Sequence, residues 1–447
     1  MTDLPLQLHA EGEDPDAARM AALERATFEY FRRMSDDSTG LVRDSTRDGS
    51  PATIAGSGFA LACYAVAAAR EFVARAEAMD YVLKSLRFLC AADQSGARNA
   101  TGYRGFFYHF LDPHTGCRYG RSELSTVDSG ILFAGALVAA AYFNGSHPGE
   151  QEIRVLADAL YRRADWSWAV APDGALRHGW RPGRGFLPYG WCGYNEALFL
   201  YILALGSPTH PISADSYARW TSTYRWKRIY GHDFLYAGPL FIHQLSHIWI
   251  DFRGVQDAFM RAKGIDYFEN SRRATYVQRE YARRNPYGFD GYNEWSWGIT
   301  ASDGPGPAQL NIDGVDRRFY AYRARGVPYG ADDGTLSPWS VAASLPFAPE
   351  IVLPALRHLD ETRPDTTGEF GYKCSYNPTF PSGANGSESG TAETGWVASG
   401  HYAIDQGPVV LMIENYRSGL IWQLLRHCPY IINGLTRAGF TGGWLKS

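Results

Sequence analysis

The sequence lacks the features that mark several protein classes. Its six cysteines are widely spaced and none forms a C-x-x-C pair, which argues against a zinc ribbon or a thioredoxin-like site. The longest apolar run, residues 131–143, is too short to span a bilayer, so no membrane partner is expected. The motifs G-x-G-x-x-G, the P-loop and G-x-S-x-G are missing, so dinucleotide, nucleoside triphosphate and serine-hydrolase chemistry have no support.

The sequence also carries little net charge, and its N-terminus lacks the pattern of a secretory signal. The formal net charge of −4 over 447 residues gives no electrostatic reason to expect nucleic-acid binding. The acidic N-terminus has no basic segment followed by an apolar one, so it does not read as a secretory signal. With free thiols expected, this predicts a cytoplasmic protein, or a periplasmic one if a leader has been removed. Residues 1–14 are expected to form a mobile acidic tail.

Aromatic residues, in contrast, are abundant. The chain has 13 Trp, 28 Tyr and 23 Phe, together 14% of its residues. Rings in this number suit a cleft that stacks flat ligands or sugar rings, although large cores use them as well. The composition is therefore compatible with carbohydrate binding without requiring it.

Apolar residues recur mainly at helical spacing, and alternating strand patterns are few and short. No linker or charge block divides the chain, so we predict one domain over residues 1–447. Several short helices look buried on most sides, as inner helices of a double-layered ring would be. The fold class predicted is all-α, with a toroidal arrangement. Helices are expected near residues 16–37, 57–74, 78–92, 125–144, 149–168, 194–206, 236–250, 254–284, 338–358, 403–414 and 417–436.

Two acidic motifs stand at predicted helix starts. In the first, Ser125 or Thr126 is a plausible N-cap, which puts Asp128 in the first helical turn and Glu123 in the preceding loop. These carboxylates could act as acid and base, or merely complement the helix dipole. In the second motif, Asn195 could cap a helix that Glu196 begins. Desolvation there would raise the pKa of Glu196, as a general acid needs, whereas a simple capping role is the alternative.

Further polar groups lie in aromatic surroundings. Glu294 and Asp303 follow Tyr292 in a Gly- and Trp-rich loop, which could be a sugar platform or a loop packed by its own rings. Asp405 precedes another apolar helix and could face the same cleft. Two histidines, His243 and His247, are spaced i,i+4, but glutamine stands where a zinc peptidase needs glutamate. Buried histidines, or one touching substrate, are the preferred interpretation over a metal site.

Several runs of the chain, from about residue 20 to 445, resemble the glucoamylase-like domain of glycoside hydrolase family 144. So many runs in the same order make the resemblance specific. The runs are 122–126, 193–196, 207–211, 239–244, 250–254, 300–305, 344–347, 404–408 and 413–420.

This resemblance implies an (α/α)6 barrel that hydrolyses β-1,2-glucan and yields sophorose and short sophoro-oligosaccharides. It also implies an inverting mechanism, which uses one carboxylic acid and one carboxylate, without metal or organic cofactor. Glu196 matches the family's G-Y-x-E glutamate, and Glu123 and Asp128 match its S-E-x-S-T-x-D run. We expect Glu196 to be the general acid and Asp128 the base, with Glu123 as the alternate base or as a group that tunes pKa values.

The positions expected to contact substrate are Trp191, Tyr194, His243, Arg253, Tyr292, Glu294, Trp297, Asp303 and Asp405. The partner implied is a β-glucan oligo- or polysaccharide. Two alternatives stay open: a hydrolase of another β-glucan, and a non-catalytic carbohydrate-binding protein on the same barrel. Neither endo or exo action nor the oligomeric state is predicted.

Overall fold

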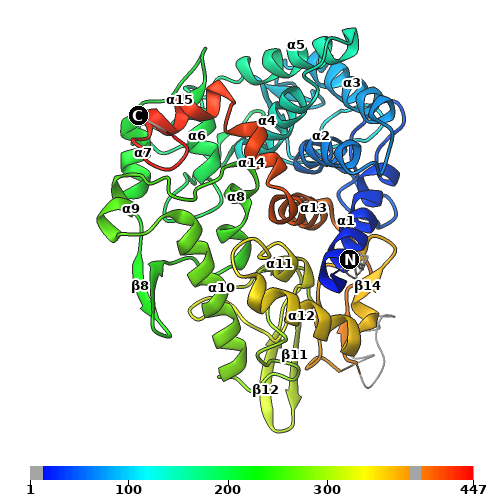
Figure 1. Cartoon of the computed structure of the whole chain (residues 1–447), viewed down its shortest axis with the longest axis vertical. Coiled ribbons are helices and arrows are strands. Elements are labelled where there is room, and N and C mark those ends of the chain that lie inside the picture. The colour runs from blue at the N-terminus through cyan, green and yellow to red at the C-terminus, as the bar shows by residue number, and fades with distance from the viewer. Residues whose placement is uncertain (1–13, 382–393, 446–447) are drawn as a thin grey trace, which may run out of the picture.

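The computed structural model describes residues 14–381 and 394–445, so the expected acidic tail lies outside the described residues except for Asp14. The chain is mostly helical (Figure 1). Six helices are buried along nearly their whole length, because they are apolar on most sides and have to be covered on most sides. These inner helices are α2 (Ile54–Ala69), α4 (Thr126–Tyr142), α6 (Leu198–Gly206), α8 (Leu245–Trp249), α11 (Pro338–Ala342) and α13 (Ala403–Arg417).

The other long helices bury one face only, as amphipathic surface helices do. Helix α1 packs on α13, α3 on α2, α5 on α4, α15 on α6 and α12 on α11. From α1 to α13, outer and inner helices alternate along the chain, except that α9 and α10 are both outer helices. The outer set comprises α1 (Pro15–Arg33), α3 (Arg75–Ala91), α5 (Pro148–Arg162), α7 (Ala214–Thr221), α9 (Ala258–Lys263), α10 (Tyr267–Arg284), α12 (Pro349–Thr362), α14 (Leu420–Leu425) and α15 (Pro429–Arg437).

The inner helices contact one another closely. Helix α2 lies against both α4 and α13, and further contacts join α4 to α6, α6 to α8, and α11 to α13. Glycine allows the closest approach: a Cβ added at Gly135 of α4 would lie 1.9 Å from the carbonyl oxygen of Gly58 in α2. The backbones of α2 and α4 therefore touch at this point, about two turns after Asp128.

Short antiparallel strands fill the long loops. Strand β5 leads directly into α4 and is the middle strand of a five-stranded sheet, ordered β2-β3-β5-β6-β7. Two hairpins, β8–β9 and β11–β12, extend away from the helices (Figure 1). The sheet strands are β2 (Gly102–Tyr103), β3 (Phe106–Tyr108), β5 (Leu124–Ser125), β6 (Gly179–Arg181) and β7 (Gly185–Phe186); the hairpin strands are β8 (Trp226–Ile229), β9 (His232–Leu235), β11 (Ala308–Ile312) and β12 (Val315–Phe319).

The remaining strands form two-stranded pairs, β1–β4, β10–β13, β14–β15 and β16–β17. Their bounds, with those of two 3-10 helices, are β1 (Ala52–Thr53), β4 (Phe110–Leu111), β10 (Ala301–Ser302), β13 (Arg323–Ala324), β14 (Thr367–Gly368), β15 (Gly371–Tyr372), β16 (Tyr376–Asn377), β17 (Trp396–Val397), η1 (Leu240–His243) and η2 (Pro364–Thr366).

Helices lie within all the predicted segments, but several differ in extent. The segment 417–436 is two helices, α14 and α15, because Pro429 begins the second one, and the segment 236–250 holds η1 and the five-residue α8. The segment 254–284 is two helices, because Gly264 ends α9 in the left-handed conformation. The segment 338–358 breaks between α11 and α12, where Pro349 begins the second helix. Helix α7 was not predicted. The single domain over 1–447 stays a prediction.

Two further expectations concern thiols and membranes. All six cysteines are free. Within residues 14–381 and 394–445, none of the helices combines the length and the apolar character that crossing a membrane requires.

Candidate functional site

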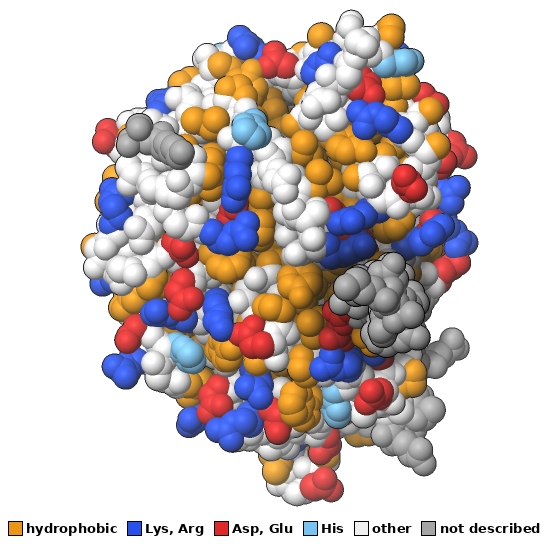
Figure 2. Space-filling view, in the orientation of Figure 1, with side chains coloured by type: hydrophobic (Ala, Val, Ile, Leu, Met, Phe, Trp, Pro, Cys, Tyr) orange, Lys and Arg blue, Asp and Glu red, His pale blue; other side chains and the backbone are white. Residues whose placement is uncertain are grey.

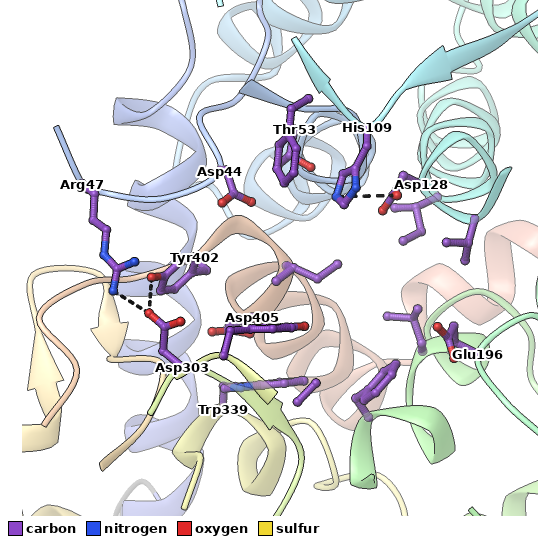
Figure 3. A pocket seen from close by; sticks show the side chains of 18 residues that line it. Asp44, Arg47, Thr53, His109, Asp128, Glu196, Asp303, Trp339, Tyr402 and Asp405 are labelled. Carbon is purple, nitrogen blue, oxygen red and sulfur yellow. Dashed lines mark hydrogen bonds and ion pairs between the residues drawn. The ribbon is translucent and has the colours of Figure 1, made fainter. Parts of the chain in front are cut away.

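A cavity of about 570 Å³ opens among the loops that enter the inner helices (Figure 3). Carboxyl groups and rings dominate its wall, so we call it the acidic cavity. Figure 3 shows Asp44, His109 and Asp128 along one side, Asp303 and Asp405 across from them, and Glu196 at one end. Its lining residues include Asp44, Arg47, His109, Phe110, Asp128, Glu196, Phe241, Asp303, Tyr322, Trp339, Tyr402 and Asp405.

Asp128 is fixed by a helix cap, as the sequence predicts. The Ser125 hydroxyl accepts a hydrogen bond from the backbone N–H of Asp128 at 3.3 Å, which confirms Ser125 as the N-cap of α4. The Asp128 side chain is only 8% exposed and its Oδ2 lies 3.7 Å from Nε2 of His109. Asp128 therefore reaches the cavity as a carboxyl group paired with an imidazole.

His109 joins two carboxylates. It stands between β3 and β4, and its Nδ1 lies 3.2 Å from Oε1 of Glu123. Burial lowers the pKa of His109, but the neighbouring Asp128 and Glu123 outweigh it and raise that pKa to about 9. The imidazole is therefore a cation at neutral pH and stabilises the charge of both partners.

Glu123 is placed beside the cavity and does not line it. Its hydrogen bond with His109 lowers its pKa to about 2, although partial burial opposes the shift. Its second oxygen lies 3.4 Å from Nη2 of Arg181. A carboxylate held in this way stays ionised, so Glu123 fits the tuning role better than the role of alternate base.

Glu196 precedes α6 and does not begin it, which corrects the sequence prediction. The helix starts at Leu198, and the Asn195 side chain instead accepts a hydrogen bond from the backbone N–H of Ala197 at 3.0 Å. The Glu196 carboxyl faces the cavity (Figure 3). Burial, reinforced by the charge of Asp128, raises the pKa of Glu196 to about 7. At neutral pH a large fraction of this group carries a proton.

The opposite wall carries Asp405 and Asp303. Asp405 lies in the first turn of α13 and is buried, which raises its pKa well above the ordinary range. Asp303 follows β10, and one of its oxygens accepts hydrogen bonds from the Tyr402 hydroxyl and the Arg47 guanidinium. Near them, burial raises the pKa of Asp44 to about 6. Asp303 is thus held by two hydrogen bonds, whereas Asp405 is buried and has a raised pKa.

Four of the twelve predicted site residues line this cavity: Asp128, Glu196, Asp303 and Asp405. The aromatic candidates near Glu196 lie behind it. The Trp191 indole donates to the Thr126 hydroxyl at 3.3 Å and stacks on His178. Tyr194 is buried and stacks on the ring of Tyr267. Neither ring lines the acidic cavity, and their role as substrate contacts stays a prediction.

The remaining candidates also lie outside the cavity lining. His243 is buried with Nε2 at 3.2 Å from the Ala237 carbonyl oxygen, and burial lowers its pKa to about 4. Arg253 pairs with Asp251 through both nitrogens at 2.8 Å. Both side chains therefore already have hydrogen-bond partners within the protein.

The Trp-rich loop is divided: Asp303 lines the acidic cavity, whereas Tyr292, Glu294 and Trp297 make their contacts elsewhere. The Tyr292 hydroxyl donates to Asp332 at 2.7 Å, and Trp297 is buried beside α11 and α12. Glu294 is half-buried, with only its backbone oxygen bonded, to the Arg279 guanidinium at 3.2 Å. None of the three lines the cavity.

Asp44, Arg47 and His109 were missed by the sequence analysis. They lie in irregular loops after α1 and between β3 and β4, where no motif distinguishes them. Tyr402 could have been found, because it stands within the same short run as Asp405. Among residues 14–381 and 394–445, no group of three or more His, Cys, Asp or Glu side chains is arranged to hold a metal ion.

Comparisons with known proteins identify the family. The Glycoamylase family model, described as "Putative glucoamylase", matches residues 188–429. A solved structure of a "putative glucoamylase" from Bacteroides uniformis is 32% identical, with a TM-score of 0.83; the match covers 97% of this chain and 100% of that one.

Two further relatives have described activities. The endo-β-1,2-glucanase of Chitinophaga pinensis, solved with sophorotriose and glucose, is 27% identical with a TM-score of 0.81, over 96% of this chain and 99% of that one. The exo-β-1,2-glucooligosaccharide sophorohydrolase (non-reducing end) of Parabacteroides distasonis is 28% identical over 94% of this chain. The chain spans 58% of the length of that curated relative.

Proposed function

The chain belongs to the Glycoamylase family, and from this membership we propose that it is a glycoside hydrolase that cleaves β-1,2-glucan or sophoro-oligosaccharides. The two relatives with described activities, one an endo-glucanase and one an exo-acting sophorohydrolase, support this substrate class. Both kinds of cleavage occur among them, so the proposal covers both.

The observation that carries the proposal is the Glu196 carboxyl, which faces a cavity rich in carboxylates with its pKa raised to about 7. A group that is largely protonated near neutral pH can donate a proton to the glycosidic oxygen as the bond breaks. The exposed Tyr322 ring and the Trp339 ring line the same cavity and offer faces on which sugar rings can stack.

In the proposed mechanism, Glu196 is the general acid and Asp128 the general base. Asp128 removes a proton from a water molecule that attacks the anomeric carbon from the face opposite Glu196. The configuration at that carbon is then inverted, which requires the two carboxyl groups to be about 6.5–9.5 Å apart. The charged His109 imidazole lies 3.7 Å from Asp128, and Glu123 helps to keep that imidazole charged.

We further propose that the alternating helices close into an (α/α)6 barrel. Six inner helices are each followed or preceded by an outer one, and contacts run from α11 through α13, α2, α4 and α6 to α8. The acidic cavity would then lie at the end of the barrel from which α4 and α13 begin.

Product analysis tests the proposed function. The protein is incubated with linear β-1,2-glucan, laminarin and cellulose, and the products are separated by chromatography. Release of sophorose or sophoro-oligosaccharides from β-1,2-glucan alone is the expected result. Products from laminarin or cellulose alone would show that the enzyme hydrolyses another β-glucan. Binding of the sugar without products would identify a non-catalytic carbohydrate-binding protein.

A further inference from the structure

A second cavity, of about 360 Å³, is lined almost entirely by arginine. Five guanidinium side chains meet there beside Gly120 and Pro182, and we call it the arginine cavity. The whole chain has a net charge of −4, and basic and acidic side chains are interspersed over the face drawn in Figure 2. The positive charge is therefore a local feature. The five residues are Arg98, Arg118, Arg121, Arg181 and Arg184.

Most of the positive charge of these five arginines is not balanced by carboxylates of the described residues. Within residues 14–381 and 394–445, only Arg181 of the five forms an ion pair, with Glu123. Arg118 donates to the Ser122 carbonyl oxygen and lies over the Tyr108 ring. The other three arginines are exposed and have no ion-pair partner in the same ranges. Burial lowers the pKa of Arg118, and the nearby Arg181 and Arg98 lower it further by repulsion.

Short contacts connect this cavity to the proposed catalytic groups. Arg181 ends β6, whose neighbour β5 runs directly into α4 and Asp128. From Arg181 the contacts pass to Glu123 at 3.4 Å, then to His109 at 3.2 Å, and then to Asp128 at 3.7 Å. A group bound in the arginine cavity would thus lie three side chains from the acidic cavity.

We propose that the arginine cavity binds an oxyanion, either phosphate or carboxylate. Guanidinium groups present paired N–H donors that match such anions, and an anion would relieve the repulsion among the five cations. Because these contacts connect the arginine cavity to His109, which lines the acidic cavity, the source favoured is a negatively charged substituent on the sugar chain being cleaved. This assignment of the source rests on the proposed function; a free anion is the other source.

Anion binding is tested first, with inorganic phosphate as the probe. Calorimetry on the intact protein at constant ionic strength should detect phosphate binding, and replacing the three exposed arginines by glutamine (R98Q, R121Q and R184Q together) should weaken it at least ~10-fold. A control variant removes the same charge elsewhere on the surface and should bind phosphate normally: R25Q, R225Q and R228Q together. Absence of phosphate binding by the wild type, or equal weakening in both variants, would overturn the proposal.

The source of the anion is tested by hydrolysis. Neutral β-1,2-glucan is compared with β-1,2-glucan that carries succinyl or phosphoglycerol groups. If the anion is borne by the sugar, the wild type should show the higher kcat/KM on the charged chain, and R98Q/R121Q/R184Q should lose that preference while keeping its rate on the neutral chain. If phosphate binds but the wild type shows no such preference, the ligand is a free anion. Failure to hydrolyse either glucan would reject the proposed function and leave the calorimetric result intact.

Discussion

Glu196 is the single side chain on which the proposed chemistry depends. Its pKa is about 7 because burial disfavours its charged form and Asp128 adds repulsion. We expect Glu196→Gln to keep the fold and to lower kcat at least ~10²-fold, since the glutamine cannot protonate the leaving oxygen. Steady-state kinetics on β-1,2-glucan measures this, with the exposed Glu361→Gln as the matched control. Near-normal turnover by Glu196→Gln would refute its assignment as the acid.

The same pKa predicts the pH dependence of the wild-type rate. A general acid is active in its protonated form, so kcat/KM should fall as the pH rises through about 7. If a residual rate can be followed in Glu196→Gln, its profile should lack this alkaline limb. A limb that persists at the same pH in the variant would belong to another group.

The base is tested by comparing two carboxyl groups on opposite walls. Asp128 lies beside the charged His109 imidazole, whereas burial raises the pKa of Asp405 and disfavours its ionised form. We therefore expect Asp128→Asn to lose at least ~10²-fold in kcat and to regain part of it with azide, which attacks without losing a proton. The exposed Asp80→Asn is the control. Azide rescue of Asp405→Asn, but not of Asp128→Asn, would assign the base to Asp405.

At the scale of elements, the helices could be predicted and their connections could not. Apolar spacing and the Ser125 cap identify α4 and place Asp128 in its first turn, because both signals are local in the sequence. Glu196 was predicted to begin α6, but the helix starts two residues later, at Leu198, since Asn195 caps the turn that precedes it. His109 and Asp44 reach the site only through tertiary contacts, which a single sequence does not reveal.

The aromatic residues also show which features the sequence predicts and which it does not. The composition is compatible with a ring-lined cleft, but Trp191 and Tyr194 do not line the acidic cavity, while Trp339 and Tyr322 do. Each ring is a good core residue and a good sugar platform, so its type alone does not assign its role. Burial by neighbouring helices makes that choice.

The contact between α2 and α4 gives a prediction for an element. A Cβ at Gly135 would lie 1.9 Å from the Gly58 carbonyl oxygen, so Gly135→Ala forces the two backbones apart. We expect a loss of at least about 2 kcal/mol in the free energy of unfolding, as overpacking against a rigid neighbour costs. Urea denaturation measures it, and Ala140→Ser, on the half-buried end of α4, is the control. A stability change no larger than that of the control would contradict the close packing.

At the scale of the whole molecule, a buried charge network joins the first helix to the last inner one. Glu24 of α1 accepts a hydrogen bond from Arg417 of α13, and Glu414 of α13 binds Arg70 through both nitrogens at 2.7 and 3.0 Å. Both carboxyl groups are almost fully buried. Any closure of the chain into a ring places this network at the junction of its two ends.

The titration of Glu24 should therefore be visible in the stability of the whole protein. Burial, together with repulsion from Glu414, outweighs the attraction of Arg417 and raises the pKa of Glu24 to about 8 from an ordinary 4.5. Between these values the unfolded chain loses its proton while the folded one keeps it, so stability falls as the pH rises through this window. Glu24→Gln cannot titrate. We expect the free energy of unfolding of the wild type, relative to Glu24→Gln, to fall by about 1–3 kcal/mol between pH 5 and pH 8.5.

Urea denaturation at both pH values measures this difference, with Glu361→Gln as the control. A difference that stays constant, or that grows in favour of the wild type as the pH rises, would mean that Glu24 is ionised in the folded protein and that its pairing with Arg417 dominates.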